Sequence, residues 1–253
     1  MTFLGTGTSN GVPMIGCHCP VCTSTDPRDR RSRTSAAVRT GGKTLLIDTS
    51  TELRTQALAT GLEHVDAVLF THPHADHTSG FDDLRRFNEL QQAHIPVFAG
   101  PETAAVLLDR FAYGFEDVFP FYGGKPDLHM NVVDGPFTAA GIDVLPIPVW
   151  HGRMPVLGYR IGDLAYVTDA KIIPEASIEI MRGVDVLAIN ALRERPHPTH
   201  LSIADAVAIV ARVKPRAAYL IHISHESSHV DASALLPDGV FVAYDGLVVT
   251  TGS

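Results

Sequence analysis

Four side chains that bind metal ions lie close together just after a short apolar run. The segment that carries them reads His72-Pro73-His74-Ala75-Asp76-His77. Alternate residues of an extended chain point the same way, so His72 and His74 can share one ion, and Pro73 keeps the segment out of a helix. Asp76 and His77 follow where the chain turns towards the next helix, and they can reach a second ion. The spacing predicts a centre for two divalent ions; the alternative is a polar loop of solvated histidines.

Two ions need more ligands than this segment supplies, and three candidates follow other apolar runs. They are His151, Asp169 and His222. If each run is a strand, the strand ends deliver these side chains to one edge of a sheet. A lone histidine at a strand end is more often structural, but the three together extend the predicted centre.

The cysteines indicate a separate metal site. The chain has three of them, all within six residues: Cys17, Cys19 and Cys22. An odd, tightly clustered set favours a metal site over a disulfide framework. Three thiolates can bind one zinc ion and leave one position for a fourth ligand, and such a closed site is structural.

The fourth ligand of the cysteine site has three candidates. His225 lies three residues after His222, so that a zinc ion on His225 would pin the N-terminal loop beside the predicted centre. His18 and His229 are the competitors, but His18 lies between two of the cysteines and would strain the loop. We therefore expect His225 to complete the site.

Apolar β-branched runs alternate with amphipathic stretches, which predicts one layered α/β domain over residues 1–253. The predicted strands are Thr44–Asp48, Asp66–Thr71, Ile95–Ala99, Ile142–Ile147, Leu157–Ile161, Leu164–Thr168, Asp185–Asn190, Ala218–Ile223, Val240–Tyr244 and Leu247–Thr250. The predicted helices are Thr51–Ala59, Phe81–Gln92, Glu102–Phe111, Glu175–Arg182 and Ile203–Val213. The pairs Gly162-Asp163 and Asp245-Gly246 are typical of hairpin turns, and residues 112–136 are expected to form an irregular insert or lid. Ser202 and Asp205 predict a capping box for the last helix.

Composition excludes several classes of protein. Hydrophobic residues make up 45% of the chain and charged residues 19%, which is typical of a globular protein. No apolar run is long enough to cross a membrane, and no secretory signal begins the chain, so we expect a cytoplasmic protein. The net charge of −8 argues against binding extended nucleic acid through a broadly basic surface. A homodimer is compatible with the sequence.

The histidine and aspartate series resembles that of the metallo-β-lactamase superfamily over nearly the whole chain. This resemblance implies a four-layer αβ/βα sandwich with a binuclear centre at one edge. It also implies that one ion binds His72, His74 and His151, that the other binds Asp76, His77 and His222, and that Asp169 bridges the two. Asp48, at the end of a predicted strand, matches the first motif of the superfamily, which supports the site without binding metal.

A narrower resemblance is to the branch that contains the phosphoribosyl 1,2-cyclic phosphate phosphodiesterases. It rests on the glycine-rich segment Gly5–Pro13, the three cysteines and the segment Leu220–His225. The branch implies that Cys17, Cys19, Cys22 and His225 bind a structural zinc ion. It also implies an active-site histidine before a helix; His200 precedes the capping Ser202 and is preferred to His197.

These features predict a metal-dependent phosphodiesterase with two catalytic ions, zinc or manganese, and one structural zinc ion. Two ions about 3.5–4 Å apart can share a hydroxide that attacks phosphorus, with Asp76 holding one ion and His200 protonating the leaving alkoxide. The expected substrate is a small cyclic phosphate or nucleotide-like ester. The basic segment Arg28–Arg39 is interpreted as a solvated face, with a substrate-phosphate contact as the alternative.

Other functions remain open at this point. The superfamily also contains coenzyme-biosynthesis proteins with a similar cysteine cluster, thioester and lactone hydrolases, and enzymes that process the 3′ ends of RNA. The chain lacks a Gly/Lys-rich arm for gripping RNA, and only 31 residues follow His222, too few for an added helical domain. An inactive metal-binding sensor is the alternative from a different class.

Overall fold

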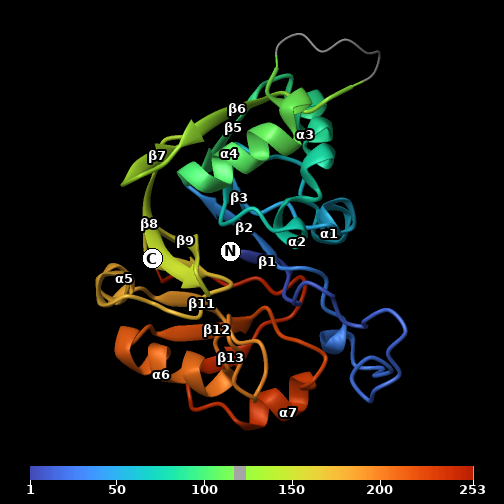
Figure 1. The fold of residues 1–253 in the computed structure, drawn as a ribbon, viewed down its shortest axis with the longest axis vertical. Helices are drawn as coiled ribbons and strands as arrows, with labels where there is room; N and C mark the ends of the chain where they lie inside the picture. The colour runs from blue at the N-terminus through green and yellow to red at the C-terminus, as the bar shows by residue number, and fades with distance from the viewer. Residues whose placement is uncertain (117–123, 253) are drawn as a thin grey trace.

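The computed structural model describes residues 1–116 and 124–252, and it contains two β-sheets (Figure 1). The first sheet has the strand order β1-β2-β3-β4-β5-β6, and the second has the order β13-β12-β11-β10-β9-β8-β7. The strands of the first sheet are β1 (Thr2–Gly5), β2 (Ser35–Thr40), β3 (Lys43–Ile47), β4 (Ala67–Phe70), β5 (Ile95–Ala99) and β6 (Leu128–Val132). Those of the second are β7 (Phe137–Ala139), β8 (Ile142–His151), β9 (Met154–Ile161), β10 (Leu164–Val167), β11 (Val186–Asn190), β12 (Ala217–Ile221) and β13 (Val240–Val242).

Helices cover the outer face of each sheet, so the chain forms the predicted αβ/βα sandwich (Figure 1). The helices are α1 (Leu53–Thr60), α2 (Ala75–Thr78), α3 (Leu84–Gln91), α4 (Pro101–Arg110), α5 (Glu175–Met181), α6 (Ile203–Val213) and α7 (His229–Ala234). Alternate residues of one strand serve two apolar layers: in β3, Leu46 packs with α1, α3 and α4, whereas Leu45 and Ile47 face the second sheet. Strands buried on both faces account for the nearly continuous apolar runs in the sequence.

Parallel pairing sets the position of the site. Strands β3, β4, β5 and β6 run parallel in the first sheet, and β10, β11, β12 and β13 run parallel in the second. Their carboxyl ends therefore meet at one edge of each sheet. Among the helices, the capping box of α6 is present as predicted, with Ser202 Oγ accepting from the amide of Asp205.

Most predicted elements are confirmed, and two are placed at their exact bounds, β5 and α6. The Gly162-Asp163 turn joins the antiparallel pair β9 and β10, as predicted. The second predicted hairpin is wrong, because β13 pairs in parallel with β12 and Leu247–Thr250 forms no strand. That segment lies instead against the start of the chain, where Phe3 donates to the carbonyl of Leu247 and Val249 to that of Met1.

Part of the predicted irregular insert is regular. Within residues 112–136, Leu128–Val132 forms β6 and pairs in parallel with β5. Only Leu128 of this edge strand is buried, and its polar residues His129 and Asn131 interrupt the apolar pattern that would have predicted it. Residues 117–123 of the insert lie outside the described residues. Within the described part of the chain, no helix has the length and apolarity needed to cross a membrane.

Candidate metal centre

The predicted centre draws its side chains from the carboxyl ends of four strands. His72, His74, Asp76 and His77 follow β4, and the last two lie in the short helix α2. The three candidates from the second sheet are His151 at the end of β8, Asp169 after β10 and His222 after β12. The structure brings all seven of these predicted residues to one edge of the sandwich.

Asp169 lies in the middle of the centre. Its Oδ1 is 3.3 Å from Nε2 of His77, and its Oδ2 is 3.3 Å from Nε2 of His222. His72 Nε2 and His200 Nδ1 lie 3.9 and 3.8 Å from Oδ2. A carboxylate with histidines on both oxygens is in the position that the predicted bridging role requires.

Two clusters of ligand atoms flank Asp169. On one side, Asp76 Oδ2 is 3.3 Å from His77 Nε2 and 3.8 Å from His222 Nε2, which is the set predicted for one ion. On the other side, His72 Nε2 lies 3.0 Å from His74 Nδ1. The ring of His151 lies 5.2 Å from that of His74, centroid to centroid. The geometry therefore matches the predicted set of Asp76, His77 and His222, whose ligand atoms lie within 4.8 Å of one another. The rings of His72, His74 and His151 are neighbours, but the ligand atoms of His72 converge with His77 and Asp169, and those of His151 with Asp169 and His200. Ligation itself stays a prediction.

Outer hydrogen bonds fix which nitrogen of each ring faces the centre. Asp48 is fully buried and accepts from His77 Nδ1 at 2.7 Å and from the Thr71 hydroxyl at 2.8 Å. Because the Thr71 hydroxyl donates to Asp48, its oxygen accepts from His72 Nδ1 at 2.9 Å. His77 and His72 are thus held with Nε2 towards the centre, the arrangement that orients metal-binding histidines.

His151 is held in the same way from the other sheet, since its Nδ1 donates to the carbonyl of Thr199 at 2.8 Å. Asn190, at the end of β11, fixes the residue after Asp169 by bonding to both the amide and the carbonyl of Ala170. Sequence reasoning missed Thr71, Thr199 and Asn190. Only Thr71, next to the histidine motif, carried a signal that could have identified it.

Three residues of the site have a left-handed backbone. Asp48, Asp169 and His222 have φ values of 60°, 56° and 57°, and each follows the end of a strand. Non-glycine residues rarely adopt this conformation, although Asp and His do so more often than most. Backbone strain of this kind is typical of functional sites.

The electrostatics of the centre favour bound cations. Burial opposes ionisation of Asp169, but His222 and His77 beside it hold the pKa of its carboxyl well below the usual range. Burial likewise opposes protonation of His77, yet Asp169 and Asp48 raise its pKa well above the ordinary value. In the described residues, Nε2 of His77 and of His222 are buried without hydrogen-bond partners. Buried imidazole nitrogens beside two carboxylates fit a pair of divalent ions.

His200 faces the centre from the loop before α6. Its ring lies 4.4 Å from that of His151 and 4.9 Å from that of His222, centroid to centroid. Together with His151 and Asp169 it offers ligand atoms within 4.8 Å of one another, so it lies within reach of an ion. His197 is 5.1 Å from His200, and Thr199 donates to its Nδ1. The geometry therefore favours His200 over His197.

The three cysteines converge on His225. Cys17 Sγ and Cys19 Sγ each lie 3.4 Å from His225 Nδ1, and Cys22 completes a set whose ligand atoms all lie within 4.8 Å of one another. All three thiols are free. Of the competing histidines, His229 lies elsewhere, with its amide bonded to Asp29.

The thiols of this site differ in acidity. A hydrogen bond from the amide of Cys22, together with His225, lowers the pKa of Cys19 to about 6. Burial raises the pKa of Cys22 to about 11. Such a set of thiols fits a zinc ion, which deprotonates its thiol ligands.

The basic segment Arg28–Arg39 is only in part the predicted solvated face. Arg31 is buried, pairs with Asp29 at 3.0 Å, and donates to the carbonyls of Ser224 and Ser227. Two others pair with acids nearer the surface: Arg28 with Asp26, and Arg33 with Glu52. The interpretation as a solvated face is wrong for Arg31, because its guanidinium group is buried and joins the N-terminal loop to the loop after β12.

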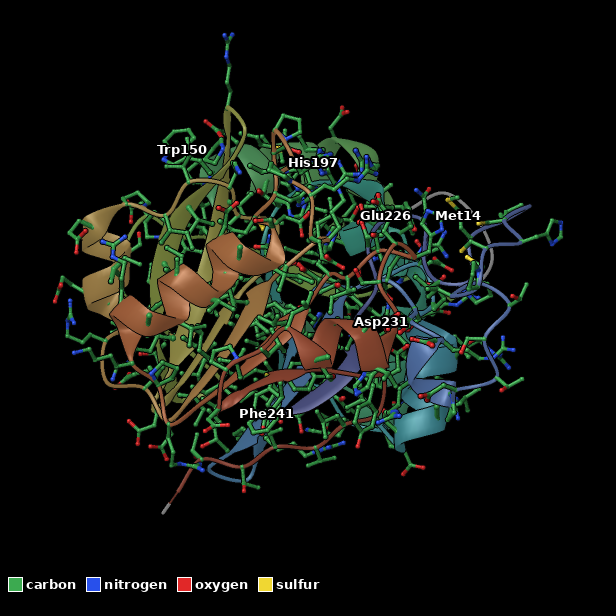
Figure 2. The ribbon with its side chains drawn as sticks, turned by 90° about the horizontal axis from the view of Figure 1, so that it is seen from below. Met14, Trp150, His197, Glu226, Asp231 and Phe241 are labelled. Atoms are coloured by element: carbon green, nitrogen blue, oxygen red, sulfur yellow. The ribbon has the colours of Figure 1, made fainter. Side chains whose placement is uncertain are left out.

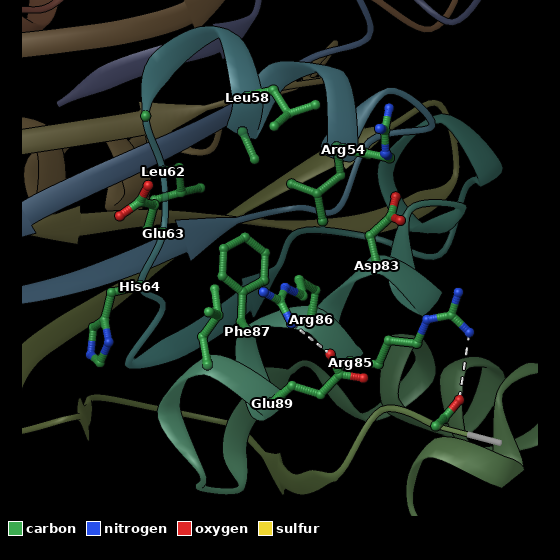
Figure 3. Close-up of a pocket in the computed structure, with 15 residues that line it drawn as sticks. Arg54, Leu58, Leu62, Glu63, His64, Asp83, Arg85, Arg86, Phe87 and Glu89 are labelled. Carbon is green, nitrogen blue, oxygen red and sulfur yellow. Dashed lines mark hydrogen bonds and ion pairs between the residues drawn. The ribbon is translucent and has the colours of Figure 1, made fainter.

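A hollow of about 1080 Å³ lies between α1 and α3, away from the predicted residues (Figure 3). Leu58, Leu62 and Phe87 give it apolar walls, and charged side chains such as Arg54 and Glu63 surround them. None of the predicted site residues lines this hollow. It is therefore not the candidate centre.

Comparison with known families gives one match over most of the chain. The β-lactamase superfamily domain matches residues 43–223. In Porphyromonas gingivalis, a protein named octanoyltransferase is 41% identical over 250 residues, which is 97% of this chain and 50% of that protein. The chain thus spans about half the length of this relative. A ribonuclease Z from Mycobacterium is 26% identical over 72% of this chain and 69% of its own length.

Solved structures agree with this match. A diphosphatase of the PhnP family is 42% identical and superposes with a TM-score of 0.90, covering 97% of this chain and 94% of its own. Zinc-bound PqqB from Methylobacterium extorquens superposes with a TM-score of 0.79 at 20% identity, covering 97% and 98% of the two chains. The second likeness is one of fold.

Proposed function

The chain belongs to the β-lactamase superfamily, and from this premise we propose that it is a metal-dependent phosphodiesterase acting on small phosphate esters. The observation that supports the proposal most strongly is the convergence of His77, His222 and Asp169. Nε2 of His77 and Nε2 of His222 are buried without hydrogen-bond partners among the described residues, and the Asp169 carboxylate lies 3.3 Å from each. This arrangement suits two cations.

The residues for the two ions are those of the predicted sets. His72, His74 and His151, whose rings are neighbours, would hold one ion. Asp76, His77 and His222 would hold the other, and Asp169 lies within 4 Å of a histidine of each set. Divalent ions there would supply an ionised water as nucleophile and would stabilise the negative charge that develops on the phosphoryl oxygens. Asp48, Thr71 and Thr199 keep the imidazole rings oriented before substrate arrives.

His200 would donate a proton to the leaving alkoxide. Burial, together with the nearby His222, lowers the pKa of His200 to about 3, so the free enzyme holds a neutral ring. The anionic phosphate of a bound substrate favours the imidazolium form, because an opposite charge nearby raises the pKa of a histidine. His200 can therefore act as the acid only when bound substrate raises its pKa far above 3.

Hydrolysis of a diphosphate bond is the second candidate. The 42% identical diphosphatase of the PhnP family covers nearly the same length of chain and has nearly the same fold. The chemistry at the metal centre is closely related, because both reactions attack a tetrahedral phosphorus. They differ in the leaving group, since a phosphate leaves readily without a proton whereas an alkoxide does not.

The test is a substrate panel with metal-reconstituted protein. It contains a five-membered cyclic phosphate ester, an acyclic alkyl phosphodiester, a nucleoside diphosphate, an octanoyl thioester, a lactone and an RNA with a 3′ extension. We expect the cyclic phosphate and the alkyl diester to be hydrolysed with the highest kcat/KM. Preference for the diphosphate would replace the proposal with the second candidate.

Activity confined to the thioester, lactone or RNA would contradict the proposal. The same preparation is analysed for metals, and we expect about three equivalents per chain, two exchangeable and one zinc that resists mild chelation. A metal-loaded protein that binds but turns over no member of the panel would support a sensor instead. An inactive Asp169→Asn variant is the control for contaminating hydrolases.

A further inference from the structure

Glu226 follows directly after the cysteine site and joins two loops. Its Oε1 accepts from Arg193 Nη1 at 2.7 Å, and its Oε2 accepts from Arg195 Nε at 3.0 Å and Nη2 at 2.6 Å. Both arginines belong to the loop between β11 and α6, which carries His200. In Figure 2, Glu226 and His197 of that loop lie along the same edge of the molecule.

The loop on which Glu226 lies is held by contacts with the N-terminal loop. Arg31 donates to the carbonyls of Ser224 and Ser227 on either side of Glu226, and the thiol of Cys19 contacts the carbonyl of His225 at 3.7 Å. Zinc on the cysteines and His225 would bind the residue next to Glu226. The carboxylate of Glu226 therefore extends from a backbone segment that is held in place on both sides.

His200 depends on its loop for its position. Its Nδ1 is buried with no hydrogen-bond partner among the described residues, so ring contacts and the backbone hold it. Backbone bonds anchor the ends of the loop, with Ser224 donating to Leu192, and Leu201 donating to Ala170. Three further contacts hold the loop between these anchors. Ile203 donates to the carbonyl of Arg193, His151 donates to the carbonyl of Thr199, and Glu226 holds the side chains of Arg193 and Arg195.

The Arg193–Glu226 pair is partly shielded from solvent, whereas Arg195, 71% exposed, makes a surface pair. The side chains of Arg193 and Glu226 are only 21% and 28% exposed, and one carboxylate serves two guanidinium groups. Exposed single pairs contribute little to stability, whereas networks and two-point arginine contacts are more directional.

Resting on the proposed function, we propose that Glu226 is a positioning residue that couples the cysteine site to His200. It acts through Arg193 and Arg195 and touches no substrate. Occupation of the cysteine site by zinc fixes Glu226, which in turn fixes the loop that places His200 beside Asp169. The site assigned a structural zinc therefore also controls protonation of the leaving group.

The test uses Glu226→Gln in the full-length, metal-loaded protein, with hydrogen exchange as a readout independent of activity. We expect faster exchange in residues 192–201 and unchanged exchange in residues 72–78. The kcat for an alkyl phosphodiester should fall by about 10-fold to 100-fold, the usual range for residues that orient a site. A p-nitrophenyl ester should lose less, because its leaving group needs little protonation. Metal content should not change.

The matched control is Glu179→Gln on α5. Glu179 also accepts two hydrogen bonds from one arginine, Oε2 from Arg182 Nε at 3.0 Å and Oε1 from Arg182 Nη2 at 2.6 Å, remote from the site. The Glu179→Gln variant should leave hydrogen exchange in residues 192–201 unchanged, and kcat for the alkyl phosphodiester and for the p-nitrophenyl ester should also be unchanged. If it reproduces the effects of Glu226→Gln, those effects reflect general destabilisation and the proposal is overturned.

Coupling is tested with Cys17→Ser, alone and combined with Glu226→Gln. Each single variant should speed exchange in residues 192–201, and the double variant should exceed neither, because both act along one path. Additive effects, or unchanged exchange in Glu226→Gln, would overturn the proposal. A protein without phosphodiesterase activity would refute the proposed function, while the exchange data would still decide the coupling.

Discussion

The two candidate metal sites lie on different kinds of structure, one on strand ends and the other on loops. The histidine and aspartate centre lies on the ends of strands buried in the sandwich, and His72, His77 and Asp48 at its base are fully buried. The cysteine site joins an irregular N-terminal loop to the loop after β12, and Cys17 and Cys19 are only half-buried. The first site rests on buried strand ends, whereas the second lies on two loops joined by the hydrogen bonds of Arg31 and by the contacts of Cys17 and Cys19 with His225.

This difference separates activity from stability. Removing a ligand from the strand-end centre should lower kcat/KM. It should lower thermal stability only where the removed side chain leaves a buried charged group without its ion-pair partner. Removing a ligand from the cysteine site should cost stability first. Variants and chemical modification at the two sites test this separation.

The largest effect is expected for Asp76→Ala. Asp76 is the most exposed carboxylate of the centre, 11% by its side chain, and its neighbours are the two histidines predicted to share its ion. Its loss should lower kcat/KM by more than about 10³-fold, since bound ions supply several kcal/mol of transition-state stabilisation. Thermal unfolding should be nearly unchanged in the chelated proteins.

His77→Ala sharpens the same comparison. It should abolish activity equally but also destabilise the fold, because it leaves the buried carboxylate of Asp48 without its ion-pair partner. Breaking a buried pair on one side costs about 3–5 kcal/mol. Equal thermal stability of the two variants would show that Asp48 does not depend on His77.

The second prediction concerns His200→Ala. If the ring protonates the leaving group, the variant should keep its metals. Its kcat for alkyl phosphodiesters should fall by about 10²–10⁴-fold, the usual range for general acid catalysis. Hydrolysis of a p-nitrophenyl ester should lose far less. Equal losses on both esters would make His200 a substrate-binding residue, and loss of metal would make it a ligand, as its distance from His151 and Asp169 allows.

The third prediction concerns Cys19→Ala. The variant should lose about one equivalent of zinc and unfold at a lower temperature, because structural zinc binding contributes folding free energy. We expect Tm to fall by more than about 5 °C, since each kcal/mol shifts Tm by roughly 2–4 °C in a domain of this size. Loss of all activity with unchanged Tm in calorimetry would reverse the division of roles.

The smallest effect is a difference in thiol reactivity after zinc removal. With its pKa at about 6, Cys19 is mainly thiolate at pH 7.5, whereas Cys22, at about 11, is protonated. Iodoacetamide should therefore modify Cys19 first, and the rate should fall as pH drops through about 6, because protonation removes the nucleophile. Peptide mass mapping measures the order. Zinc should protect both residues, and protection of neither would exclude a thiolate zinc site.

The sequence predicted the residues of the centre better than their supports. His72, His74, Asp76 and His77 lie in one segment, and the other ligands end apolar runs, so strand direction brings them together. Thr199 acts through its backbone carbonyl, which any residue could provide, and Asn190 acts through its side-chain amide on the backbone of Ala170, a distant residue. Their type and spacing carry no chemical signal, and only the folded chain places them.

The fold was predictable for most strands that are buried on both faces and less so at the edges. Two strands of the first sheet, the edge strand β1 and its interior neighbour β2, were not predicted. Strands β10 and β11 read as continuous apolar runs, whereas β6, an edge strand, buries one residue of five. The segment Leu247–Thr250 shows the opposite error, because its composition favours a strand but its neighbour is the start of the chain. Pairing of distant segments is not contained in a local pattern.

The left-handed backbone at Asp48, Asp169 and His222 restricts how this protein can change over evolutionary time. Asparagine and glycine accept that conformation, whereas alanine and valine add a backbone penalty of about 1–2 kcal/mol to the lost side chain. A lineage that drifts away from catalysis while keeping its fold should therefore accumulate asparagine or glycine at these three positions. Asparagine or glycine at these positions in a homologue would indicate that it has lost catalytic activity, even where the remaining histidines of the centre are kept.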